Sequence, residues 1–138
     1  MNIKGSTRIV GIIVLIAGCL VSGQLLSQTK MSDGYTLEDF SLRTAADLVD
    51  LCRLDMSHQD HVTARAFCYG FFEGGIHYAE AISTSPNFTK LVCAPPDTTR
   101  TEAVDVFVTY VQANPQYASK RPIDTIYRAL VDKWPCDG

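Results

Sequence analysis

Hydrophobic residues recur every three or four positions in four separate segments of this chain, and polar residues fill the positions between them. This spacing is typical of helices that place one face against a core. In the clearest segment, from about residue 60 to residue 82, the recurring positions are Ala64, Phe67, Cys68, Phe71, Gly75, Tyr78, Ala79 and Ile82. Four helices joined by short connections predict a small all-α bundle.

The starts of these helices carry recognisable capping residues. Thr44 and Thr99 each precede an acidic residue by three positions, which is the spacing of a capping box. The segment after Thr99 is also compatible with a strand, because residues 104–111 alternate and are rich in β-branched side chains. The cap and the stop signal at Asn114-Pro115 favour a helix.

The N-terminal segment has the layout of an export signal. Two basic residues, Lys4 and Arg8, precede the uncharged run 9–23. Three outcomes are open: cleavage after Gly23, cleavage at a lipobox whose Cys19 would be lipidated, or retention as a membrane anchor. Each of them delivers the rest of the chain outside the cytoplasm. The predicted divisions are an export signal (1–23), a flexible leader (24–40) and a helical domain (41–138).

The charge of the chain argues against a nucleic-acid partner. Without the two basic residues of the N-terminal segment, ten basic and fifteen acidic residues remain, which is a net charge of −5. A surface of this sign repels a phosphate backbone. It is better suited to a basic protein partner.

Four of the five cysteines follow the export signal, and an even number in a small exported domain predicts disulfides. Three pairings are open. If the third and fourth helices run antiparallel, Cys136 lies near Cys93, and Cys52 is left for Cys68. We therefore predict the pairs Cys52–Cys68 and Cys93–Cys136, and each should stabilise the fold by about 2–4 kcal/mol.

Cysteines and histidines close in sequence also raise the question of reactive chemistry. Zinc sites usually contain a C-x2-4-C pair, which is missing from the set Cys52, His58, His61 and Cys68. A nucleophilic Cys68 would need a base, and His77 lies nine residues further on, near the opposite side of the helix. No phosphate loop, paired-carboxylate motif or Ser-His-Asp spacing occurs in the sequence. We predict neither an enzyme nor a metal or cofactor site.

Three glycines lie inside the longest predicted helix, where each costs about 0.5–1 kcal/mol relative to alanine. We predict that a neighbouring backbone packs closely against them and offsets this cost. Phenylalanines on the same helix would fill the space around that contact. The residues assigned to this packing are Gly70, Gly74, Gly75, Phe67 and Phe71.

Five short motifs follow one another along the chain. They are Leu-Cys at 51–52, Phe-Cys-x-Gly with a later glycine at 67–74, Cys-x-Pro at 93–95, Asn-Pro at 114–115 and Pro-Cys at 135–136. As a set, they resemble the Rap/Tai-type immunity proteins of type VI secretion. The match covers about residues 46–136. The framework positions that carry over are the four cysteines, Gly70 and Gly74.

This resemblance implies a small, secreted, all-helical and often dimeric protein. Such a protein would bind a peptidoglycan amidase effector in the periplasm and block its active site. The expected partners are therefore a secreted cell-wall amidase and a second copy of the chain, with Cys19 as a membrane tether if it is lipidated. The inhibitory surface of the family is a variable loop, so the resemblance assigns no contact residues.

Residue chemistry instead points to the turn at residues 114–122 as a partner-binding surface. This turn is polar and basic, and it lies between two predicted helices. Tyrosine is favoured as an anchor at interfaces, so we place Tyr117 at the centre of the surface, together with Gln116, Lys120 and Arg121. The competing interpretation is a plain turn with a solvated tyrosine.

A second function is also compatible with the sequence, namely a periplasmic helical stress protein of the HdeA chaperone type without a toxin partner. Such a protein should lose its dimer and expose apolar surface in acid. An immunity protein should stay folded and bind one partner tightly. The cysteine framework and the order of the motifs favour the immunity protein.

Overall fold

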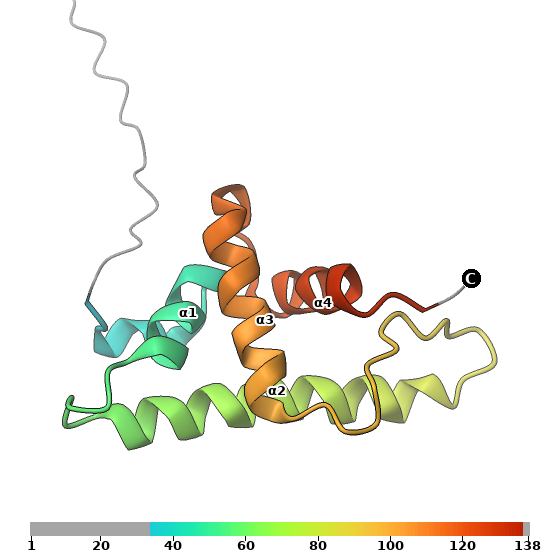
Figure 1. Cartoon of the computed structure of the whole chain (residues 1–138), viewed down its shortest axis with the longest axis horizontal. Helices are drawn as coiled ribbons and strands as arrows, with labels where there is room; N and C mark the ends of the chain where they lie inside the picture. The colour runs from blue at the N-terminus through green and yellow to red at the C-terminus, as the bar shows by residue number, and fades with distance from the viewer. Residues whose placement is uncertain (1–33, 137–138) are drawn as a thin grey trace, which may run out of the picture.

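The computed structural model describes residues 34–136 of the chain. Within this range it contains α1 (Ala45–Arg53), α2 (His61–Ser83), α3 (Arg100–Ala113) and α4 (Pro122–Lys133), with the short 3₁₀ helices η1 (Leu37–Ser41) and η2 (Pro115–Tyr117). The predicted all-α bundle is confirmed. The strand interpretation of residues 104–111 is wrong, because they lie inside α3. In Figure 1 the long α2 lies along one side, and α1, α3 and α4 lie on the other.

The predicted export signal, its Cys19 and the first part of the leader lie outside the described residues. The last residues of the predicted leader, 34–40, run into η1, which packs next to α1. None of the helices that the structure describes is both long enough and apolar enough to cross a membrane.

The predicted capping boxes at Thr44 and Thr99 are confirmed. The Thr44 backbone N–H donates to an Asp47 carboxylate oxygen at 3.0 Å, and the Asp47 N–H donates back to the Thr44 hydroxyl at 3.3 Å. The same reciprocal pair joins Thr99 and Glu102 at 2.7 and 3.2 Å. Each box satisfies N–H groups that the first turn of a helix leaves without partners.

The core lies where α1, α3, α4 and the first half of α2 meet. Helix α1 is enclosed by its neighbours, with buried residues on most of its circumference: Ala45, Ala46, Leu48, Val49, Leu51 and Cys52. Phe72 of α2 meets Phe107 of α3 edge to face, with ring centroids 5.6 Å apart. Both rings are almost completely buried, so this pair joins α2 to α3 at the centre of the fold.

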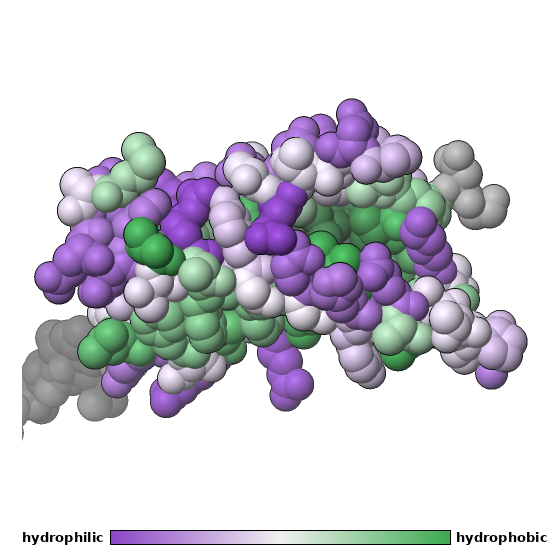
Figure 2. All heavy atoms as spheres, turned by 90° about the horizontal axis from the view of Figure 1, so that it is seen from below, coloured by the Kyte–Doolittle hydropathy of each residue, from purple (hydrophilic) through white to green (hydrophobic). Residues whose placement is uncertain are grey.

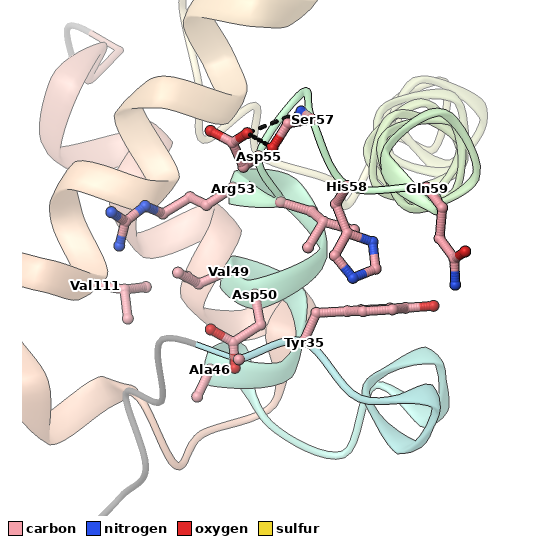
Figure 3. Close-up of a pocket in the computed structure, with 12 residues that line it drawn as sticks. Tyr35, Ala46, Val49, Asp50, Arg53, Asp55, Ser57, His58, Gln59 and Val111 are labelled. Carbon is pink, nitrogen blue, oxygen red and sulfur yellow. Dashed lines mark hydrogen bonds between the residues drawn. The ribbon is translucent and has the colours of Figure 1, made fainter.

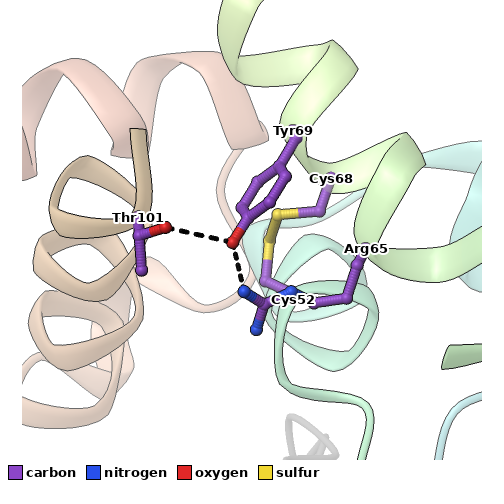
Figure 4. The surroundings of a disulfide bond; sticks show 5 residues. All are labelled: Cys52, Arg65, Cys68, Tyr69 and Thr101. Atoms are coloured by element: carbon purple, nitrogen blue, oxygen red, sulfur yellow. Dashed lines mark hydrogen bonds between the residues drawn. A yellow bond between two sulfur atoms is a disulfide. The ribbon is translucent and has the colours of Figure 1, made fainter. Parts of the chain in front are cut away.

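Both predicted disulfides are confirmed. Cys52–Cys68 joins α1 to α2, with Cα atoms 5.3 Å apart. Beside it, the Tyr69 hydroxyl accepts a hydrogen bond from Arg65 and lies 3.3 Å from the Thr101 hydroxyl, as Figure 4 shows. Cys93–Cys136 joins the segment before α3 to the end of the chain, with Cα atoms 4.9 Å apart.

The hydrophobic stripe predicted for α2 is only half correct. The buried residues of α2 are Ala64, Cys68 and Phe72, all in its first half. Phe67, predicted to fill space around the glycines, is 37% exposed and packs edge to face on Phe40 of η1 at 4.9 Å. Phe71 is partly buried against the core. Tyr78 is 68% exposed, because α1 and α3 cover only the first half of α2.

The prediction that Gly70 and Gly74 are packing sites is wrong. Among the described residues, a Cβ added to either would meet no heavy atom within 4 Å beyond the neighbouring helix backbone. Packing within residues 34–136 therefore does not require glycine at either position. Gly75 is different, because a Cβ at that position would lie 2.9 Å from Cδ1 of Ile123 in α4.

Candidate partner-binding site

The turn at residues 114–122 is fixed onto the start of α1. The carbonyl oxygens of Lys120 and Ala118 accept hydrogen bonds from the N–H groups of Ala45 and Ala46, at 2.7 and 2.9 Å. The first N–H groups of a helix have no partner within that helix, so the turn supplies acceptors to α1. Ala118 is completely buried as a result. The turn is therefore held in one conformation by backbone contacts.

Tyr117 is half-buried and packed, which differs from the exposed anchor that we predicted. Its ring stacks on Tyr110 of α3, with centroids 5.6 Å apart and planes 28° apart. The guanidinium of Arg128 lies 5.3 Å from the centre of the same ring. Desolvation raises the pKa of Tyr110, and the neighbouring Tyr117 adds to the rise. Tyr117 thus offers one edge to a partner, while its position is set by α3 and α4.

Gln116, Lys120 and Arg121 are exposed on this turn, as predicted. Arg43 lies two residues before Ala45, the residue that is bonded to the Lys120 carbonyl. We call Arg43, Lys120 and Arg121 the basic corner. Among the residues that the structure describes, none of these three side chains forms an ion pair with a carboxylate. The basic corner is therefore a cationic surface on a chain that is acidic as a whole.

Arg43 was not assigned to this site from the sequence, although it belongs to it. It lies more than 70 residues from Lys120 along the chain, and only the docking of the turn onto α1 brings the two segments together. Its position just before a helix cap gave no indication of that contact. Arg128 escaped notice for a similar reason, because it pairs with Asp124 of its own helix and reaches Tyr117 only in the folded structure.

A second exposed surface runs along α2. Phe67, Gly70, Gly74 and Tyr78 follow one another at spacings of three and four, so they share one side of the helix. We call these four residues the glycine face. Figure 2, which views the molecule from the α2 side, shows hydrophobic residues gathered over one half and a hollow with hydrophobic walls in the other. The glycine face offers a partner two aromatic rings with backbone accessible between them.

A hollow of about 690 Å³ lies beside α1, with its floor formed by Ala46, Val49 and Val111. Figure 3 shows Tyr35, Asp50 and His58 around it. The Asp55 carboxylate on its rim accepts hydrogen bonds from the hydroxyl and the backbone N–H of Ser57, which lower the pKa of Asp55. Carboxylates, a cation and apolar side chains are mixed in its walls, so the hollow has no single charge.

A comparison with protein families agrees with this fold. The model of the Rap1a immunity proteins matches residues 44–136. The chain belongs to this family. The matched range contains α1 to α4 and both disulfides of the Rap1a-family chain. Searches of curated proteins and of solved structures found no match.

The Rap1a-family structure separates the cysteines and histidines that lie close in sequence. Cys52 and Cys68 are joined to each other, so neither is a free thiolate. The Nδ1 atom of His61 lies 2.7 Å from the Leu54 carbonyl oxygen, while His58 Nδ1 accepts from the Asp60 N–H at 3.1 Å. In the described part of the chain, no group of three or more His, Cys, Asp or Glu side chains is arranged to hold a metal ion. The surfaces described above are suited to binding a protein.

Proposed function

We propose that this protein is a periplasmic immunity protein that binds a peptidoglycan amidase effector of type VI secretion and inhibits it by binding alone. The observation that carries the proposal is the family match over residues 44–136. Two disulfides support export, because such bonds persist in oxidising compartments. The uncharged run 9–23 after two basic residues supports it as well.

The contact surface that we propose is the turn at residues 114–122 with the basic corner. Ordering a loop at the moment of binding reduces affinity, and this turn is already ordered by its bonds to α1. The cations of the basic corner, which form no ion pair within residues 34–136, suit an acidic region of the partner, and this charge complementarity would speed association and select against cationic surfaces. Gln116 and the exposed edge of Tyr117 would make the central contacts.

The test is protection of cells from the effector. A predicted amidase or other toxin encoded next to this chain is the first candidate partner, and a pull-down from the producing cells provides others. Co-expression with the exported amidase should restore growth, and the purified chain should inhibit hydrolysis of peptidoglycan at a one-to-one ratio. Growth arrest despite normal levels of folded chain would contradict the proposal.

The contact surface has its own test. Replacing Lys120 and Arg121 with glutamate should weaken binding by at least about 10-fold, because two attractive charges become repulsive. Lys90→Glu combined with Lys133→Glu is the matched control, since both are exposed cations outside the turn and the change in total charge is the same. If the control weakens binding as much as the replacement of Lys120 and Arg121 does, the effect arises from total charge and the turn is not the contact.

We further propose that two copies pair through the glycine face. Gly70 and Gly74 each cost helix stability, and within the described residues no other segment would meet a Cβ at either position, so close approach of a second helix would account for them. Gly74→Leu should shift the sedimentation of the chain from dimer to monomer without changing its helical circular dichroism. Glu80→Leu, at an exposed position six residues after Gly74 and therefore on another side of α2, is the matched control. A dimer that persists in Gly74→Leu would place the pairing surface elsewhere.

We propose that the leader, residues 24–40, links the folded domain to the cell envelope. If Cys19 is lipidated, the chain should incorporate labelled palmitate and sediment with membranes, and Cys19→Ser should abolish both. If the signal is cleaved after Gly23, both the wild-type chain and the Cys19→Ser variant should be released with the soluble periplasmic fraction.

The HdeA-type function predicts a different result, which is binding of a hydrophobic dye and protection of other proteins in acid.

A further inference from the structure

The two disulfides of the chain differ in how exposed they are to solvent. Cys52 is 3% exposed and Cys68 is completely buried, so their sulfur atoms lie inside the core between α1 and α2. Cys93 is exposed and Cys136 is half-buried. Cys93 is therefore the disulfide cysteine most open to a reagent in solution, whereas the inner pair is reached only after α1 and α2 separate.

The outer disulfide holds a long and largely exposed segment, in which Val92 is partly buried against the core. Residues 84–99 connect α2 to α3, and nearly all of them are exposed. Apart from the disulfide, the backbone bonds that tie this segment to the end of the chain are the donation from the Cys93 N–H to the Trp134 carbonyl at 2.9 Å and the isolated bridge between Val92 and Pro135. Connections of this length without secondary structure are uncommon in compact domains and are often functional.

We propose that Cys93–Cys136 is a redox latch, which a dithiol reductant opens in the native protein while Cys52–Cys68 stays oxidised. A thiolate of the reductant attacks Sγ of Cys93, the bond between the two cysteine sulfurs breaks, and Cys136 leaves as a thiolate. The second thiol of the reductant then attacks its own sulfur in the mixed disulfide and releases Cys93. The reductant is oxidised to a disulfide, and the protein gains two electrons and two protons.

Opening the latch frees residues 84–99 and the segment after Lys133. Leu91 belongs to the wall of a hollow of about 410 Å³, together with Tyr127 and Val131 of α4. Release of the segment removes this wall and exposes more of α4. Most members of the core lie in α1, α3, α4 and the first half of α2, and the inner disulfide still joins α1 to α2, so the core is retained. This inference does not depend on the identity of the partner.

Selective reduction tests the latch directly. The folded full chain is incubated with dithiothreitol at neutral pH without denaturant, alkylated at intervals, and mapped by peptide mass. Cys93 and Cys136 should become alkylated at least about 100-fold faster than Cys52 and Cys68, because the inner pair requires a structural opening first. Equal rates for the two pairs, or faster reduction of the inner pair, would overturn the proposal.

Limited proteolysis tests the release of the segment. Lys90 is exposed within residues 84–99, so trypsin should cut after it at least about 10-fold faster once the latch is open. Cleavage after Arg65, in the first half of α2, is the internal control and should stay slow. A Cys93→Ser, Cys136→Ser variant should behave as the reduced chain does, and if it does not fold, the reduced wild-type chain still gives the result. Unchanged cleavage after Lys90 would show that the segment is held by other contacts and would overturn the latch.

Discussion

The two halves of α2 have a similar spacing of hydrophobic residues, but the first half is buried against other helices and the second half is largely exposed. In the first half, Ala64, Cys68 and Phe72 are buried against α1 and α3. In the second half, Tyr78 is 68% exposed and Ile82 is 36% exposed. A helical hydrophobic pattern therefore identifies an apolar face of a helix. It does not show whether residues of the same chain bury that face.

The second half of α2 is attached to the fold by few contacts. The Tyr127 hydroxyl of α4 donates to the Gly75 carbonyl at 2.9 Å, and Ile123 packs beside the same glycine. The phenol of Tyr127 is neutral and a donor at physiological pH even at the ordinary tyrosine pKa of about 10, and burial raises its pKa further. Four predictions compare well-packed with exposed parts of the molecule, from the largest expected effect on stability to the smallest.

Phe72 should be the most sensitive position of α2. Phe72→Ala should lower the free energy of unfolding by about 3–5 kcal/mol, because it removes the buried ring that packs on Phe107. Phe67→Ala is the matched control in the same helix and should cost about 1 kcal/mol or less, since its ring is already 37% exposed. Urea unfolding followed by circular dichroism measures both. Similar losses would mean that the two rings are equally important to the fold.

Removal of the inner disulfide should cost more than removal of the outer one. The chain-entropy estimate ranks them the other way, at about 3 kcal/mol for the 16-residue separation of Cys52 and Cys68 and about 4 kcal/mol for the 43 residues between Cys93 and Cys136. However, once its disulfide is removed, the segment 84–99 also gains freedom in the folded state. This gain offsets part of the stability that is lost with the outer disulfide.

The measurement compares paired alanine variants, Cys52→Ala with Cys68→Ala against Cys93→Ala with Cys136→Ala, by urea unfolding. Alanine avoids placing a hydroxyl in the core next to α1. A larger loss of stability on removing the outer pair would mean that residues 84–99 stay well ordered without their disulfide. The exposed segment and the core around the inner disulfide would then differ less than the structure indicates.

Gly74→Ala should stabilise the monomer by about 0.5–1 kcal/mol, because the new methyl group meets open space and the helix loses an entropic cost. Gly75→Ala should stabilise the monomer by less than Gly74→Ala does. The new Cβ would lie 2.9 Å from Ile123 Cδ1, so the Ile123 side chain must shift. Thermal unfolding at a concentration where the chain is monomeric measures both. A loss of stability in Gly74→Ala would show that the glycine face is covered within the monomer.

The smallest effect should be a dependence on pH at the start of α3. Hydrogen bonds from the Thr99 backbone N–H, and then from its hydroxyl, lower the pKa of Glu102. The folded pKa lies below the unfolded one, so this contribution is present above the ordinary glutamate pKa of about 4.3 and is lost as the pH falls through the folded value. Glu102→Gln should therefore be less stable than wild type at pH 7, and the gap should close as the pH falls below the folded pKa of Glu102. Asp105→Asn is the exposed control in α3, and a gap independent of pH would contradict this origin.

Local chemistry explains the predictions that succeeded. The boxes at Thr44 and Thr99 involve residues three positions apart, so their spacing alone defines the contact. The pairing of Cys93 with Cys136 was also predicted, because it required only that the ends of two helices meet. The glycine prediction failed for the opposite reason. Whether a second backbone passes Gly70 depends on where α3 crosses α2, and no local pattern encodes that crossing.

The sequence by itself determined the four helices, the caps at Thr44 and Thr99 and the resemblance to a family, because each rests on residue spacing or on the order of short motifs. The cysteine pairs required one further assumption, that the third and fourth helices run antiparallel. Only the tertiary structure decided that the turn at 114–122 is docked on α1, that Arg43 joins its basic corner, and that one disulfide is buried while the other is exposed. These facts depend on how helices distant in sequence pack against one another. Packing of this kind is set by the shape and burial of whole surfaces, which a periodic pattern along one helix does not specify.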